Sequence, residues 1–265
     1  MPHIDQHKPG SFCWIELATT DQNAAKTFYG SLFSWAAKDE PMGPGSFYTM
    51  FKLGNDDTGA AYTLRPDQHA LRVPPHWMLY IMVENADAMA VRIAKAGGTI
   101  IMAPFDVMDA GRMAVIRDPT GAHFCIWQPN KSTGIQIAGE HGTLCWADLN
   151  SPDPERACQF YKDVFGWNFI QDTHSDPPSG YMQIQNGDEF IGGIPPCSPQ
   201  TAKIPGFWLP YFLVSECDAT TSKAKEIGGK SCMEPMTLEN VGRMSVLADP
   251  QGGAFAIFQP LPMKS

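Results

Sequence analysis

The sequence predicts an α+β protein in which one small domain occurs twice in tandem, each copy consisting of two βαβββ modules. Two pairs of aligned stretches show the duplication. Residues 10–35 match residues 142–167 at a displacement of 132 (142 − 10), and residues 110–129 match residues 241–260 at a displacement of 131 (241 − 110). Short strand-like apolar runs surround two runs with helical spacing in each copy. We therefore expect two similar halves.

The first helix of each copy has a recognisable beginning and end. In the second copy, Asp153 can cap the free N–H groups, Pro154 suits the first helical turn, and Gly166 can adopt the left-handed conformation that ends a helix. The first copy repeats this pattern over residues 21–33, with Ser34 in place of the glycine. Both copies are thus expected to begin with a strand followed by a capped helix.

A second strand and helix follow in each copy. The run WMLYIMV leads to a helix over residues 85–96 that ends at two glycines, and WLPYFLV leads to a helix that ends before Gly228. The last two strands of the first copy are joined by a tight DPTG turn at residues 118–121. These elements predict a first domain over residues 1–130, a linker over 131–140 and a second domain over 141–265.

Composition restricts the partners and the compartment. The net charge of −9 argues against nucleic acid and anionic membranes as partners. No run approaches the roughly 20 apolar residues of a membrane span, and no targeting segment is evident, so we expect a cytoplasmic protein. The seven cysteines are odd in number and form no CxxC motif, which favours reduced core residues over a disulfide framework or a zinc site.

The order of these motifs resembles the vicinal oxygen chelate superfamily, which includes glyoxalase I, bleomycin-resistance proteins and extradiol dioxygenases. The resemblance lies in the helix motif D-x-x-x-A-x-x-F-Y and the final D-P-x-G-x-x-F-x-I-x-Q-P, both present in each half. More narrowly, the W-x-[DE]-L at the start of each half resembles a bacterial subgroup called glyoxalase-like. The resemblance implies mixed sheets that curl around a cavity for a small molecule or a divalent metal, with the two domains pairing within the chain.

The same resemblance implies metal ligands that this sequence lacks. At the first-strand ligand position stand Trp14 and Trp146, which have no usable lone pair. The remaining positions hold side chains and small residues unsuited to a hard divalent metal: Met78, Leu209, Cys125, Ala256, Gly59-Ala60-Ala61 and Ile191-Gly192-Gly193. The sequence therefore predicts no cofactor at the standard positions.

A displaced metal site in the first domain is the alternative. Glu16, His76 and His123 each lie two positions from a missing ligand, and strand residues two apart share a face. The second copy has Asp148, Phe207 and Ala254 there, so the set does not recur. We favour the interpretation of His76 and His123 as partly exposed residues at strand ends.

A carboxylate recurs at Glu16 and Asp148, each two residues after a tryptophan. Desolvation in a partly apolar cavity would raise its pKa and suit it to general-base catalysis or to binding a polar ligand group. The structural alternative is that the carboxylate accepts hydrogen bonds from a neighbouring strand or loop, or pairs with Arg112 and Arg243, which also recur.

Recurring aromatic residues could form the walls of a ligand site, since such sites are mostly apolar with a few polar groups. The same residues could instead fill a small core. The candidates for ligand binding are Trp14, Trp77, Tyr80, Trp146, Trp208 and Tyr211.

The favoured function is binding of a small organic molecule in a cavity that lacks the standard metal ligands, as in bleomycin-resistance proteins. One alternative is a lyase or isomerase that uses Glu16 or Asp148 as a base, or the displaced divalent-metal site of the first domain. A second alternative is a scaffold with filled cavities.

Overall fold

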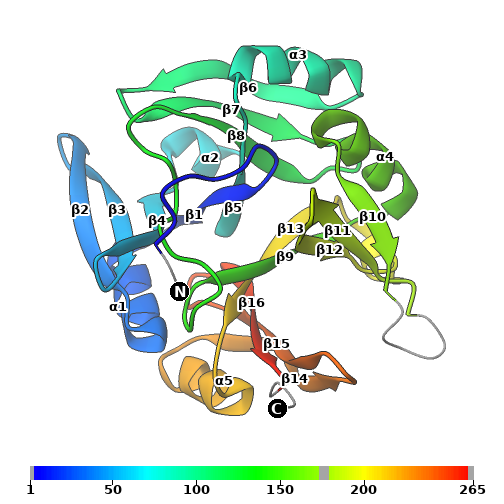
Figure 1. Ribbon diagram of the computed structural model, residues 1–265. Coiled ribbons are helices and arrows are strands. Elements are labelled where there is room, and N and C mark those ends of the chain that lie inside the picture. Colours follow the sequence, from blue (N-terminus) through cyan, green and yellow to red (C-terminus); the bar gives the residue numbers. More distant parts are fainter. Residues whose placement is uncertain (1–2, 173–178, 262–265) are drawn as a thin grey trace.

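The computed structural model describes residues 3–172 and 179–261, which form two eight-stranded mixed sheets with the longer helices on one face of each (Figure 1). The strand order is β2-β3-β4-β1-β5-β8-β7-β6 in the first sheet and β10-β11-β12-β9-β13-β16-β15-β14 in the second. The two orders are equivalent strand for strand. The predicted α+β fold with two βαβββ modules in each copy is confirmed.

The first domain contains two modules. Their elements are β1 (Phe12–Thr19), α1 (Gln22–Phe33), β2 (Ala36–Gly43), β3 (Ser46–Leu53), β4 (Asp56–Thr63), then β5 (His76–Met82), α3 (Ala86–Lys95), β6 (Thr99–Val107), β7 (Gly111–Arg117) and β8 (His123–Pro129). A short helix that the sequence did not predict, α2 (Pro66–Ala70), lies between the modules.

The second domain repeats this plan. Its elements are β9 (Leu144–Asn150), α4 (Pro154–Phe165), β10 (Asn168–Gln171), β11 (Met182–Asn186), β12 (Glu189–Ile194), then β13 (Phe207–Leu213), α5 (Cys217–Glu226), β14 (Lys230–Leu238), β15 (Gly242–Ala248) and β16 (Ala254–Pro260). A 3₁₀ turn, η1 (Thr201–Lys203), takes the place of α2. None of the described helices is long and apolar enough to cross a membrane.

The predicted helix ends are confirmed. Asp21 caps α1 by accepting a hydrogen bond from the Ala24 amide, and Asp153 caps α4 in the same way. Gly166 ends α4 with a φ of 74°, in the left-handed region that glycine adopts without a Cβ clash. Ser34 adopts the same conformation at the end of α1, with a φ of 62°.

The two modules of a domain meet where β1 pairs antiparallel with β5, and β9 with β13. Glu16 lies opposite Met78, and Asp148 lies opposite Leu209. Because side chains alternate between faces of a strand, these residues share the face that does not carry the helices. We call it the helix-free face of each sheet, because it lacks the long helices; in the first domain the short α2 reaches it through the hydrogen bond that Gln68 donates to the Tyr62 hydroxyl.

The main core lies between the helix-bearing faces and joins the two domains. Helix α1 contacts α5 of the other domain, and α3 contacts α4, as Figure 1 shows. Two reciprocal pairs of buried hydrogen bonds cross this junction. The Tyr29 hydroxyl donates to Asp249 and the Tyr161 hydroxyl to Asp118, while the indole N–H groups of Trp35 and Trp167 donate to the carbonyls of Gly142 and Gly10.

The cysteines are all free, as expected, but they are not all core residues. Cys13, Cys125 and Cys217 are buried, whereas Cys197 and Cys232 are exposed. The exposed pair lies in a loop and on an edge strand, where an apolar sequence context does not ensure burial.

Candidate functional site

On the helix-free face of the first sheet, the Glu16 carboxylate is held by two tyrosines. It accepts a 2.6 Å hydrogen bond from the Tyr48 hydroxyl and a 3.1 Å bond from the Tyr80 hydroxyl. The indole N–H of Trp14 donates to the Tyr48 hydroxyl at 3.0 Å. Strands β1, β3 and β5 therefore each supply part of one polar cluster.

The second sheet carries the same arrangement around Asp148. Its carboxylate accepts hydrogen bonds from Tyr181 at 2.5 Å and from Tyr211 at 2.7 Å. The indole N–H of Trp146 lies 3.1 Å from Asp148 and 2.8 Å from the Tyr181 hydroxyl. The two carboxylate–tyrosine clusters are thus Glu16, Tyr48, Tyr80 and Trp14 in the first domain, and Asp148, Tyr181, Tyr211 and Trp146 in the second.

Burial changes the proton affinity of both clusters. The pKa of Asp148 is raised from 3.8 to about 6, because burial disfavours the carboxylate and this outweighs the hydrogen bonds that favour it. Burial likewise raises the pKa of Glu16, against the opposing effect of the two tyrosine donors. The pKa of Tyr48 and that of Tyr80 are also raised, by burial and by the neighbouring carboxylate. The tyrosines therefore remain donors at neutral pH, while Asp148 titrates close to it.

Apolar side chains surround each cluster. In the second domain they form a cluster distinct from the main core, in which Leu209, Met244 and Ala256 are buried and Met233 and Phe258 partly buried. In the first domain Met78 and Cys125 occupy the corresponding face, and Cys125 lies opposite Tyr80. Each carboxylate is therefore a polar group in an apolar surface.

These side chains do not fit a divalent metal. Trp14, Met78 and Cys125 stand at positions where the resemblance to the vicinal oxygen chelate superfamily implies metal ligands. Burial raises the pKa of the Cys125 thiol, which opposes the thiolate form that binds metal. Glu16 is the one carboxylate in this cluster, and each of its two oxygens already accepts a hydrogen bond from a tyrosine hydroxyl. Within residues 3–172 and 179–261, no three His, Cys, Asp or Glu side chains are grouped as a metal site.

The displaced set of Glu16, His76 and His123 is not brought together as such a group. The ring of His76 is hydrogen-bonded at 2.8 Å to the carbonyl of Pro74, at the start of its strand. His123 is an exposed residue at the start of β8. Both histidines thus lie at the first residues of their strands, β5 and β8, as the sequence suggested.

The structural alternative named two kinds of partner for these carboxylates. Hydrogen bonds from a neighbouring strand are observed, because Tyr80 on β5 and Tyr211 on β13 donate to Glu16 and Asp148, whereas pairing with the recurring arginines is not. Arg112 forms ion pairs with Asp87 and Asp106, and Arg243 with Asp218. These arginines are fixed by acidic residues at the surface, and the tyrosines fill the partner role at Glu16 and Asp148.

The aromatic candidates fall into two groups. Trp14, Tyr80, Trp146 and Tyr211 belong to the two clusters, as the hydrogen bonds above show. Trp77 and Trp208 lie on the opposite face of their strands, where their indole N–H groups donate to the hydroxyls of Tyr29 and Tyr161 in the main core. We therefore assign these two tryptophans to the core.

Sequence reasoning missed Tyr48 and Tyr181. The strand pairing shows that these two tyrosines are equivalent. Glu16 pairs with Ala60, and its counterpart Asp148 pairs with Gly193, so the two copies are displaced by 133 residues in this region (193 − 60). Tyr48 and Tyr181 are separated by the same 133 residues (181 − 48). The displacements of 132 and 131 seen elsewhere do not align the two tyrosines. A search with a local change of displacement would have found the pair.

Comparison with known proteins agrees with the fold and with the duplication. The family described as the Glyoxalase/Bleomycin resistance protein/Dioxygenase superfamily matches residues 11–126 and again residues 143–257. Among solved structures, the Mn(II)-bound glyoxalase from Novosphingobium aromaticivorans has a TM-score of 0.65 at 14% identity, covering 96% of this chain and 83% of that one. The 2,3-dioxygenase LapB from Pseudomonas sp. KL28 has a TM-score of 0.67 at 10% identity, covering 98% and 97%. At these identities the likeness concerns the fold alone.

Two relatives of known sequence match nearly the whole chain. The protein CFP32 of Mycobacterium tuberculosis, whose name assigns it provisionally to the glyoxylases, is 39% identical over 100% of both chains. The anthracycline biosynthesis protein DnrV of Streptomyces peucetius is 31% identical over 95% of this chain and 94% of its own. The two family matches, with the paired sheets, establish that this chain belongs to the glyoxalase/bleomycin resistance protein/dioxygenase superfamily and carries two domains of that kind.

Proposed function

We propose that the protein binds a small organic molecule on the helix-free faces of its sheets, with the carboxylate–tyrosine clusters as polar anchors. The observation that carries the proposal is the recurrence of the same buried cluster in both halves, around Glu16 and around Asp148. Burying a carboxylate in an apolar surface has a free-energy cost, which ordinary packing does not require. Its retention in both copies supports a role in ligand recognition.

The chemistry of the clusters favours a ligand with carbonyl or hydroxyl groups on an apolar frame. With a pKa of about 6, the Asp148 carboxyl can donate a hydrogen bond when protonated and accept one when ionised. The tryptophans and methionines beside each cluster offer polarisable apolar contact.

The name of one relative suggests the ligand class with which to begin. DnrV is an anthracycline biosynthesis protein. Anthracyclines are planar polycyclic ketones with several hydroxyl groups, which is the chemistry that the clusters suit. We therefore propose a planar polycyclic ketone or phenol as the ligand.

Calorimetric titration with an anthracyclinone, the sugar-free ring system, tests this proposal. We expect two sites per chain, and at least a tenfold loss of affinity at one site in each of the Glu16→Gln and Asp148→Asn variants. Glu84→Gln, which neutralises an exposed surface carboxylate, is the matched control and should bind like the wild type. Wild-type affinity at both sites in the two cluster variants would refute the anchoring role.

The raised pKa of Asp148 favours a second candidate function, that of a lyase or isomerase with this carboxylate as general base. The glyoxalase test substrate is the hemithioacetal of methylglyoxal and glutathione. Turnover should rise with pH through about 6 as Asp148 ionises, and Asp148→Asn should abolish it. If the wild-type protein does not turn over this substrate at any pH between 5 and 8, glyoxalase activity is ruled out.

A further inference from the structure

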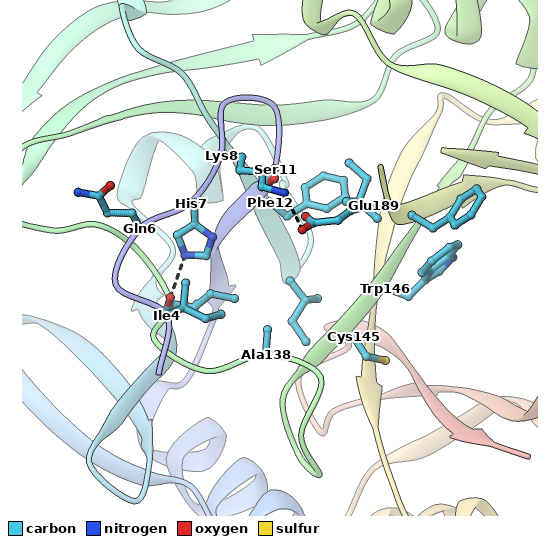
Figure 2. Close-up of a pocket in the computed structure, with 14 residues that line it drawn as sticks. Ile4, Gln6, His7, Lys8, Ser11, Phe12, Ala138, Cys145, Trp146 and Glu189 are labelled. Carbon is cyan, nitrogen blue, oxygen red and sulfur yellow. Dashed lines mark hydrogen bonds and ion pairs between the residues drawn. The ribbon is translucent and has the colours of Figure 1, made fainter. Parts of the chain in front are cut away.

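A cavity of about 340 Å³ lies between the two domains, outside the carboxylate–tyrosine clusters but sharing one wall with the second (Figure 2). The N-terminal segment, the linker and the beginnings of β9 and β12 line it, and it is open to solvent on one side. Its walls include Phe12, Trp146 and Phe190, and its polar groups include His7, Lys8 and Glu189. The volume is at the small end of the roughly 300–1,000 Å³ range of ligand pockets.

The duplication allows this cavity to be compared with the equivalent corner of the first domain. In the first domain, the linker fills the corner between β1 and β4: the Ile135 amide donates to the Cys13 carbonyl at 2.7 Å, and the Gln136 amide donates to the Asp57 carbonyl at 2.7 Å. Ile135 is only 1% exposed there. We call residues 134–136 the linker strap.

The corresponding corner of the second domain lies between Cys145 (13 + 132) and Phe190 (57 + 133), and both residues line the cavity. The cavity is therefore the counterpart of a corner that a peptide segment fills in the first copy. Phe190 is 47% exposed beside it. With Phe12 and Trp146 it gives the cavity aromatic walls, and ligand pockets are lined mostly by apolar and aromatic side chains.

The lining indicates the chemistry of that ligand. Lys8 and Glu189 form a 2.7 Å ion pair with each other, so their charges are mutually compensated. The His7 ring is hydrogen-bonded at 2.8 Å to the Ile135 carbonyl, and burial lowers the pKa of this histidine, which keeps the ring neutral at pH 7. A charged ligand would have to compete for Lys8 or Glu189, whereas a neutral one would not.

We propose that this cavity binds a neutral planar aromatic molecule of two or three fused rings, in contact with Trp146. This site is additional to the carboxylate–tyrosine clusters. The proposal rests on the proposed function in one respect, that the ligand is a small molecule. The Trp146 indole N–H contacts both Asp148 and Tyr181. A ligand against Trp146 would therefore touch a side chain of the second cluster.

The test uses 2-naphthol, a neutral two-ring phenol, and its anionic analogue 2-naphthoate, titrated by calorimetry at pH 7. We expect one 2-naphthol site per chain and at least tenfold weaker binding of 2-naphthoate. Ala138→Phe, which fills the cavity, and Phe190→Ala, which removes a wall, should each weaken 2-naphthol at least tenfold. Val91→Ala on the exposed side of α3 is the control and should have no effect.

A second readout keeps the proposal testable if one of these variants folds poorly. In ¹⁵N-labelled protein, 2-naphthol should shift the indole N–H resonance of Trp146, assigned with Trp146→Phe. No shift of this resonance at saturating 2-naphthol would overturn the proposal.

The failures of the two proposals are distinguishable. Unchanged 2-naphthol binding in both Ala138→Phe and Phe190→Ala, with loss in Glu16→Gln or Asp148→Asn, would overturn the cavity site and leave the clusters as the site. Equal affinity for 2-naphthoate would overturn the neutral ligand class. Binding that appears only after deletion of residues 262–265 would mean that the chain itself occupies the cavity, and would also overturn the proposal.

Discussion

The Tyr29 hydroxyl donates a 3.0 Å hydrogen bond to the carboxylate of Asp249, 220 positions later in the chain. The same hydroxyl accepts a 3.1 Å bond from the Trp77 indole, so one buried atom links a helix, a strand and a turn of the other domain. Tyr161, Asp118 and Trp208 repeat the arrangement at 3.1 and 3.0 Å. Two equivalent Trp–Tyr–Asp hydrogen-bond chains thus connect the domains.

Tyr29→Phe should lower the free energy of unfolding by about 1–3 kcal/mol, because it leaves the buried Asp249 oxygen and the Trp77 N–H without this partner. Urea denaturation followed by circular dichroism measures the change. Tyr161→Phe, its counterpart, should have an effect of similar size. Wild-type stability in both variants would show that these bonds do not contribute to the junction.

Ser34→Gly should stabilise the protein by about 0.5–1 kcal/mol, because Ser34 has a left-handed φ of 62° that costs an L-residue free energy but not glycine. Gly166→Ser introduces the same strain at the end of α4, where φ is 74°, and should destabilise the protein by a similar amount. Thermal unfolding of the pair measures both effects. Changes of the same sign in both variants would contradict the explanation.

Gly134→Ala should release the linker strap, because a Cβ at this residue would lie 2.2 Å from the Cys13 carbonyl oxygen and φ is +120°. Hydrogen exchange of the Ile135 amide measures the release, and we expect it to accelerate by at least tenfold. Gly45→Ala is the control for strain without a clash, since its φ is +69° and no atom lies within 4 Å of its Cβ position. Equal protection of Ile135 in wild type and Gly134→Ala would contradict the fit of the strap.

The raised pKa of Asp148 predicts a pH dependence of stability. Its folded pKa of about 6 exceeds the reference value of 3.8, so its contribution to stability is complete below about pH 4 and is lost as the pH rises through 6. The free energy of unfolding of wild type minus that of Asp148→Asn should therefore fall between pH 4 and 6, by at most about 1.4 kcal/mol per pH unit.

Asp87→Asn provides a control of opposite sign, because the hydrogen-bonded Arg112 lowers the pKa of Asp87. The free energy of unfolding of wild type minus that of Asp87→Asn should rise as the pH increases through the acid range. A flat or rising difference for Asp148→Asn would mean that this carboxyl group is not desolvated in solution.

Most of the fold could be predicted because its determinants are local. Asp21, Asp153 and Gly166 act within one helical turn, and the duplication confirmed each element by repetition. The short α2 was missed because five residues carry too little periodicity to identify a helix. The linker strap depends on close contact of Gly134 with Cys13, which no local pattern encodes.

The candidate site was only partly predictable. Trp14 and Glu16 were linked correctly because residues two apart in a strand share a face. By the same rule Trp77 and Tyr80, three apart, lie on opposite faces, so the sequence already contained the information that separates them. Tyr48 comes from β3, which is separated from the strand of Glu16 by β4, and its place at Glu16 depends on two strand registers that the structure provides.

The central claim is that the helix-free faces bind an organic ligand through the carboxylate–tyrosine clusters. A crystal structure of the protein with a bound anthracyclinone tests it most directly. We predict ligand oxygen atoms within hydrogen-bonding distance of the carboxyl or tyrosine hydroxyl groups around Glu16, Asp148 or both. A ligand bound solely at places that contact neither cluster would contradict the claim.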